Sequence, residues 1–85
     1  MKIVLEKNKT INILGIINFR LNKVYNVKKY TLRASLLIEE QNSNRTHKMS
    51  LSAKKQSVIS AVGYSVTVTG LDIESQTMII EVKFK

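Results

Sequence analysis

The chain has 85 residues, no cysteine, no proline, one histidine and a formal net charge of +8. This length allows one domain, predicted over residues 1–85, and the hydrophobic fraction of 44% is too high for a disordered chain. The lack of cysteine excludes disulfides, thiolate metal sites and thiol nucleophiles, and it fits a reducing cytoplasm as the expected location.

Residues 1–21 carry the alternating apolar pattern of β-strands. Ile3 and Leu5 predict a short strand, and the KNK at 7–9 predicts a polar turn. The odd positions from 11 to 21 are apolar around Gly15, which predicts one long strand with a bulge or sharp bend at the glycine. The apolar stretch from Ile11 to Phe19 is too short to span a membrane and lacks a signal-peptidase site.

Residues 22–51 predict further strands. Residues 22–29 read as a weaker strand or an irregular bend around Asn26, whereas apolar side chains occupy every even position from Tyr30 to Ile38. The QNSN at 41–44 is typical of a turn. In residues 46–51, His47 alternates in step with Met49, which predicts a second strand of a hairpin with the histidine at the edge of the core.

Residues 52–63, SAKKQSVISAVG, leave helix and strand both open. Ser52 can cap a helix, Gly63 stands where a C-terminal glycine would follow it, and Val58, Ile59 and Val62 share a helical face. The adjacent β-branched pair at 58–59 lowers helix propensity and makes a strand the alternative. A short helix is the preferred interpretation.

The C-terminal residues predict another hairpin. Apolar side chains alternate from Tyr64 to Val68 and from Met78 to Phe84, and the DIES at 72–75 predicts the turn between them. The segment TMIIEVKF at 77–84 is β-prone with few charges, so it would pair with another chain if it lay at a sheet edge.

Together the elements predict an all-β domain with one short helix. The expected architecture is a small five- to six-stranded barrel whose element order resembles an OB-type barrel, with the helix between strands three and four. If residues 57–62 are extended instead, a β-sandwich is the alternative. This prediction rests on the order of elements, and a fold does not determine a function.

The sequence does not predict an enzyme. His47 is the one side chain with an ordinary pKa near neutrality, and no spacing selects a serine nucleophile to accompany it. Glu39 and Glu40 are adjacent, so on a strand they face opposite sides. Asp72 and Glu74 suggest a solvated turn rather than a metal site, and no glycine-rich loop for a phosphate cofactor is present. We expect no catalytic residues, no metal, no cofactor and no small-molecule substrate.

The distribution of charge gives the most specific functional hypothesis. Residues 7–38 include seven basic and no acidic side chains, a field that attracts polyanions or acidic proteins. Phosphates bind cations and bases stack on aromatic rings, and Tyr25 is the candidate ring because Phe19 and Tyr30 follow the core alternation. The predicted binding residues are Lys23, Tyr25, Lys28, Lys29, Arg33, Arg45 and Lys48.

We therefore expect a non-enzymatic module that contacts nucleic acid through phosphate with little sequence specificity, with an acidic protein as the other partner. An Asn- and Lys-rich composition is also typical of AT-rich genomes, which leaves open a basic surface without a partner. The alternative function is a protein-interaction or assembly module, such as a small adaptor, an inhibitor or a homo-oligomer from a phage or mobile element. It rests on apolar side chains at positions predicted to face outward, namely Leu14, Ile16, Leu37 and Ile79. Membrane binding is not expected, because no basic amphipathic helix is evident.

Overall fold

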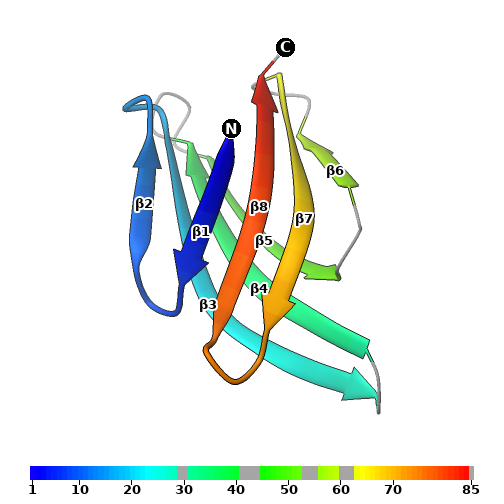
Figure 1. The fold of residues 1–85 in the computed structure, drawn as a ribbon. Coiled ribbons are helices and arrows are strands. Elements are labelled where there is room, and N and C mark those ends of the chain that lie inside the picture. Colours follow the sequence, from blue (N-terminus) through cyan, green and yellow to red (C-terminus); the bar gives the residue numbers. More distant parts are fainter. Residues whose placement is uncertain (29–30, 41–44, 53–55, 60–62, 85) are drawn as a thin grey trace.

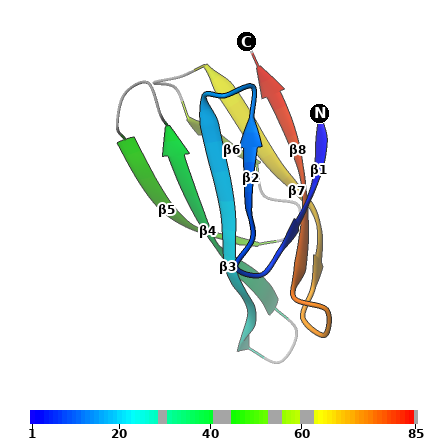
Figure 2. The ribbon, with the colours of Figure 1, turned by 90° about the vertical axis from the view of Figure 1, so that its left-hand side faces the viewer.

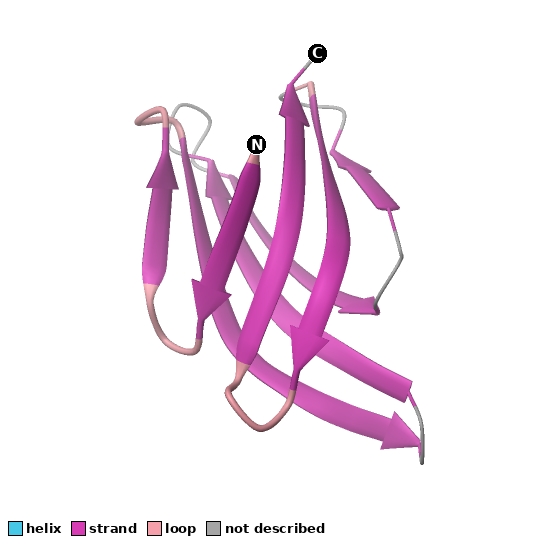
Figure 3. Cartoon of the chain, viewed as in Figure 1, coloured by secondary structure: helices cyan, strands magenta, loops and turns pink. Residues whose placement is uncertain are grey.

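The computed structural model describes residues 1–28, 31–40, 45–52, 56–59 and 63–84, and these form strands joined by turns. They contain no helix, and so none long and apolar enough to cross a bilayer (Figure 3). The strands are β1 (Lys2–Glu6), β2 (Thr10–Ile13), β3 (Ile17–Lys28), β4 (Thr31–Glu40), β5 (Arg45–Ser52), β6 (Gln56–Ile59), β7 (Tyr64–Asp72) and β8 (Thr77–Phe84) (Figure 1). The prediction of an all-β chain is confirmed.

The strands form two antiparallel sheets. Sheet A has the order β1-β8-β7-β6 and sheet B has the order β2-β3-β4-β5, and the two lie as separate layers (Figure 2). Within the described ranges one isolated bridge, between Lys7 and Leu21, joins the sheets, and no closed barrel forms. The predicted five- to six-stranded OB-type barrel is therefore not confirmed, whereas the β-sandwich alternative is compatible with this arrangement.

A tight turn replaces the predicted bulge at Gly15. Leu14 and Gly15 have φ values of 55° and 70°, and the Ile16 N–H donates to the Ile13 carbonyl at 3.0 Å. Positive φ at both central positions matches the twist of a hairpin, so the predicted single strand is two strands, β2 and β3. The side chains predicted to face inward still lie on one face in both strands, because Ile13 is in register with Ile17 and opposite residues share a face.

The helix predicted within 52–63 is wrong at residues 56–59. These form β6, whose Val58 lies in register with Ser65 of β7. Ser52 ends β5 instead of capping a helix, and Gly63 has a φ of 73° in the turn before β7. The β-branched residues at 58 and 59 favour the extended chain, and β7 supplies their backbone partners. Residues 53–55 and 60–62 lie outside the described part of the chain, as does the turn predicted at 41–44.

The core lies between the sheets and collects every second residue of their strands. β7 and β8 bury alternate side chains as predicted from Tyr64 to Val68 and from Met78 to Val82, whereas Phe84, at the end of the predicted alternation, is 38% exposed. β8 pairs with β1 on one side and β7 on the other, so the C-terminal strand does not form the sheet edge at which it could recruit another chain. The buried apolar residues are Ile3, Leu5, Ile13, Ile17, Phe19, Leu21, Val24, Ala34, Leu36, Ile38, Tyr64, Val66, Val68, Met78, Ile80 and Val82.

A bulge in β3 decides which side chains reach the outer face of sheet B. Leu21 is in register with Leu36 and Lys23 with Ser35, so Asn22 is an extra residue in the ladder. An unbroken alternation would bury residues 23 and 25 after Leu21. Because the bulge shifts the alternation by one position, Val24 is buried instead.

The side chain of Gln76, in the turn between β7 and β8, holds the backbone of Val24. The Val24 N–H donates to Gln76 Oε1 at 2.8 Å, and Gln76 Nε2 donates to the Val24 carbonyl at 2.9 Å. Nε2 also donates to the Ile73 carbonyl at 2.8 Å, which fixes the amide within its own turn. We call this set of contacts the Gln76 clamp. It supplies β3 with backbone partners where the neighbouring strand β2 does not reach.

Replacing Gln76 with Ala should destabilise the fold. The N–H and carbonyl of Val24 would lose their partners at a part-buried position, and we expect the free energy of unfolding to fall by about 1–3 kcal/mol. Urea denaturation should show a lower midpoint with an unchanged m-value.

Two further variants test whether the lost hydrogen bonds to Val24 cause the destabilisation. Gln76→Glu can still accept from the Val24 N–H but cannot donate to a carbonyl, so it should also destabilise. Glu74→Ala, at an exposed position in the same turn, should leave the midpoint close to wild type. Equal midpoints for Gln76→Ala and Glu74→Ala would contradict a structural role for the clamp.

Candidate nucleic-acid interface

The outer face of sheet B is basic. Arg20 of β3 and Lys48 of β5 lie on either side of Leu37 of β4, with which each is in register. Because neighbouring strands are about 4.8 Å apart, the two Cα atoms are separated by about 10 Å. Farther along the sheet, β3 contributes Lys23 and β4 contributes Arg33. We define the basic face by these four cations, of which Arg33 is half-buried and the others are exposed.

Four side chains of this face contact one another across three strands. Lys23 Nζ lies over the Tyr25 ring, 5.2 Å from its centroid, and the Tyr25 hydroxyl is 2.7 Å from Ser50 Oγ. Arg33 Nε donates to Ser50 Oγ at 3.0 Å, and its Nη2 donates to the Ser50 carbonyl at 3.1 Å. The ring is therefore tied at its hydroxyl and covered on one face by a cation. The guanidinium is held against β5 by neutral partners, which leaves its charge uncompensated by these contacts.

The charge of the basic face is not neutralised from within the described residues. The ion pairs found there involve Glu6, Glu40 and Glu81, and none includes a cation of the basic face. One acid, Glu39, is exposed on β4 beside the face. The other four acidic residues of the chain belong to the strands of sheet A and their turn, namely Glu6, Asp72, Glu74 and Glu81. Sheet A also carries Lys2 and Lys83, so acids and bases are mixed there, whereas the outer face of sheet B is predominantly basic.

Asp72 shapes the turn that carries the Gln76 clamp. Its pKa is lowered by a hydrogen bond from the Ser75 side chain and by the backbone N–H groups of Glu74 and Ser75. The N–H of Glu74 lies 3.0 Å from Asp72 Oδ1. The carboxylate thus closes a turn, in agreement with the predicted solvated turn.

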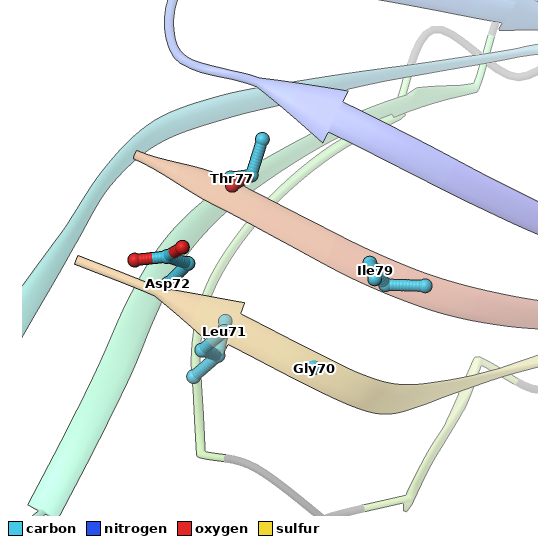
Figure 4. Close-up of a pocket in the computed structure, with 5 residues that line it drawn as sticks. All are labelled: Gly70, Leu71, Asp72, Thr77 and Ile79. Carbon is cyan, nitrogen blue, oxygen red and sulfur yellow. The ribbon is translucent and has the colours of Figure 1, made fainter. Parts of the chain in front are cut away.

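The outer face of sheet A contrasts with the basic face because apolar side chains cross it. Val4 of β1, Ile79 of β8 and Gly70 of β7 lie in register, and Val4 is 51% exposed. A hollow of about 150 Å3 lies beside them, lined by Gly70, Leu71, Asp72, Thr77 and Ile79 (Figure 4). A Cβ added at Gly70 would stand 3.4 Å from the Ile79 side chain, so the glycine keeps this hollow open.

Several predicted binding residues reach the basic face and others do not. Lys23, Tyr25 and Arg33 form one contact cluster, and Lys48 lies across the sheet from Arg20. Lys28 is exposed at the far end of β3, away from the central rungs. Lys29 lies outside the described residues. Arg45 begins β5 in register with Glu40, and its side chain also lies outside the described part.

Sequence reasoning missed two contributors. Arg20 is predicted to face outward but is distant from the lysine cluster along the chain, so spacing does not select it. Its inclusion follows from the register that brings it level with Lys48. Ser50 carries no charge, and its role as the shared partner of Tyr25 and Arg33 depends on two strand pairings.

A buried polar cluster joins the two sheets beneath the basic face. Glu40 is 3% exposed, and its Oε1 accepts from His47 Nε2 at 3.1 Å and from the Tyr64 hydroxyl at 3.4 Å. Burial, the Glu40 charge and this hydrogen bond raise the pKa of Tyr64. His47 is half-buried and satisfied by a core carboxyl, as expected for a histidine at the edge of the core. The cluster links β4 and β5 of sheet B to β7 of sheet A.

In the described parts of the chain, no three His, Cys, Asp or Glu side chains come together as metal ligands. Comparison with protein-family models, with curated proteins and with solved structures finds no match to this chain. The two outer faces therefore carry the chemistry from which a function can be proposed.

The raised pKa of Tyr64 predicts alkaline destabilisation. In the unfolded chain the phenol ionises near pH 10, whereas in the fold it stays protonated to higher pH. Above pH 10 the unfolded state therefore binds fewer protons, and stability should fall by about 1.4 kcal/mol per pH unit from this group. Urea midpoints between pH 8 and 11 would measure the slope.

Tyr64→Phe should remove this part of the pH dependence, although it also loses one hydrogen bond at every pH. Tyr25→Phe, which changes a phenol at the surface, should retain the wild-type slope. Parallel profiles for wild type and Tyr64→Phe would show that burial of Tyr64 does not couple to folding.

Proposed function

We propose that this protein is a non-enzymatic binding module whose basic face contacts nucleic acid through phosphate, with little sequence specificity. The observation that carries the proposal is the set of four cations on one sheet face with no ion-pair partner among the described residues. A cytoplasmic location, expected from the lack of cysteine, would give such a surface access to nucleic acid.

The geometry favours phosphate contact over base stacking. The Tyr25 ring has Lys23 over one face and its hydroxyl is tied to Ser50, so a base that stacks on that face must compete with the Lys23 ammonium. Arg33 keeps one terminal nitrogen, Nη1, outside its contacts with Ser50, and a phosphate oxygen can accept from it. Cations spaced across a sheet face attract a polyanion without reading its sequence, which supports weak specificity.

Binding should depend steeply on salt. If the four cations of the basic face each neutralise one phosphate, log affinity for duplex DNA should fall with log salt at a slope of about −3.6. Fluorescence anisotropy with labelled oligonucleotides over a range of salt concentrations measures this slope. Absence of binding at low salt would rule out the proposed function.

Charge variants measured in the same anisotropy experiment show which face of the protein contacts the nucleic acid. Lys48→Gln should weaken binding and reduce the size of the slope by about 0.9, whereas Lys83→Gln, on the outer face of sheet A, should change neither. Glu39→Gln removes the acid beside the face and should strengthen binding. Equal effects of Lys48→Gln and Lys83→Gln would indicate a non-local charge effect.

A second candidate function is assembly through the outer face of sheet A. Exposed Val4, half-buried Ile79 and the hollow at Gly70 form an apolar surface that a second copy of the chain can cover. This candidate replaces the edge-strand route, because β8 is an interior strand.

The assembly candidate predicts a mass above 9.7 kDa in light scattering. Val4→Asp should return the protein to a monomer, because it places a charge in the apolar surface. Leu14→Asp, at a 69% exposed position in the β2–β3 turn, is the matched control and should leave the mass unchanged. A wild-type protein that stays monomeric over a wide concentration range would exclude this candidate.

A further inference from the structure

The paired ends of β3 and β4 extend beyond the sandwich as a two-stranded ribbon. The last pair between β4 and β5 is Arg33 with Ser52, and past it β3 and β4 pair with each other through Asn26 and Lys28. On the other side of β3, pairing with β2 ends at Arg20. The two strands run out past the lower end of β5 in Figure 1, and past the other strands of sheet B in Figure 2. We define the ribbon as residues 26–28 with 31–32.

The β3 side of the ribbon is open to solvent, whereas Leu32 of β4 is half-buried and packs against the core at its base. Asn26, Val27 and Lys28 are all exposed, and Val27 is an extra residue in the ladder, because Asn26 is in register with Leu32 and Lys28 with Thr31. A strand packed on a core would bury one of two neighbours, as β3 does between Ile17 and Leu21. Val27 is 51% exposed, so an apolar side chain stands in water at this projecting end. Three residues of strand give the ribbon a reach of about 10 Å.

The dimensions and side chains of the ribbon fit the major groove of B-DNA. That groove is about 12 Å wide and about 8.5 Å deep and admits a two-stranded β-ribbon. Lys28 supplies a cation, Asn26 an amide and Val27 an apolar contact, which are the groups that meet base edges and thymine methyl groups there. At the base of the ribbon, Lys23 and Arg33 stand where phosphates flanking the groove would pass.

This surface offers a single-stranded nucleic acid fewer contacts than it offers a duplex. Binding of single strands depends on aromatic rings on which bases stack. Of the described aromatic residues, Phe19 and Tyr64 are buried, and Phe84 belongs to sheet A. Tyr25 is covered on one face and tied, as its contacts with Lys23 and Ser50 show. Within the described ranges, one face of Tyr25 is thus the available stacking platform, and a duplex, whose backbone and groove need none, is the better fit.

We propose that the β3–β4 ribbon enters the major groove of duplex DNA while the basic face contacts the flanking phosphates. The proposal rests on the proposed function and adds to it a duplex preference, a groove and the element that enters the groove. It also predicts discrimination against duplex RNA, whose A-form major groove is deep and too narrow for side chains to read.

The test compares the full chain on one sequence presented as single-stranded DNA, duplex DNA and duplex RNA, with dimethyl sulfate footprinting of the DNA duplex. Guanine N7 faces the major groove, so we expect its protection from methylation in the DNA complex. Affinity should be highest for duplex DNA. Val27→Glu should weaken duplex binding about ten-fold and abolish the protection, because it places a carboxylate among base edges and phosphates.

Leu14→Glu is the matched control, since it adds the same charge at an exposed apolar position in a different hairpin. It should leave affinity within about two-fold and keep the protection. Lys48→Gln should weaken binding without abolishing the protection. This pattern supports the ribbon proposal.

Other results overturn it. Equal affinity for single-stranded and duplex DNA, or for duplex RNA, without N7 protection but with the Lys48→Gln effect, would refute the ribbon and leave the proposed function standing. If the ribbon instead pairs with the ribbon of a second copy, the protein would be a dimer and Val27→Glu would dissociate it. Guanine N7 would then not be protected, and the groove proposal would be refuted. Absence of binding to any of these nucleic acids at low salt would refute both proposals.

Discussion

The Gln76 clamp is the contact on which the arrangement of the basic face depends. One side-chain amide from the β7–β8 turn of sheet A satisfies both backbone groups of Val24 in sheet B. It does so where β3 has passed the end of β2 and would otherwise expose unpaired backbone. With Val24 held inward, the bulge at Asn22 directs Lys23 and Tyr25 outward. The contact between sheets therefore sets the chemistry of the outer surface.

The interior and the two outer faces serve different purposes. Apolar side chains fill the space between the sheets, and the Glu40 carboxyl bonds the Tyr64 hydroxyl across it, so the polar groups of the core also join the layers. Outside, sheet A and its turn carry four acids together with Lys2 and Lys83, whereas the outer face of sheet B carries four cations and one acid, Glu39. Such an uneven distribution of charge orients a basic protein toward a polyanion and favours one face for contact.

The proposed interface combines a fixed part with a projecting part. Tyr25, Arg33 and Ser50 are connected by hydrogen bonds across three strands, which reduces the side-chain freedom lost on binding. In the ribbon beyond them, Asn26, Val27 and Lys28 are exposed, and Leu32 holds its base against the core. A flat charged face and a narrow extension together match a duplex better than either would alone, since phosphates and the groove are met at once.

The sequence by itself determined the β class, the inward residues of most strands and the basic character of residues 19–33. Those features follow from local alternation and composition, which do not depend on distant contacts.

Tertiary structure decided the rest. The turn at Gly15 and the strand at 56–59 divided the chain into two sheets, because long-range pairing outweighed weak local preferences. Arg20 joined the basic face through register with β4 and β5, and Tyr25 faced outward because of a bulge that a residue fifty-two positions away helps to hold. Alternation cannot reveal an inserted residue, so the face of Lys23 and Tyr25 was settled by the packing of Val24 and its hydrogen bonds to Gln76.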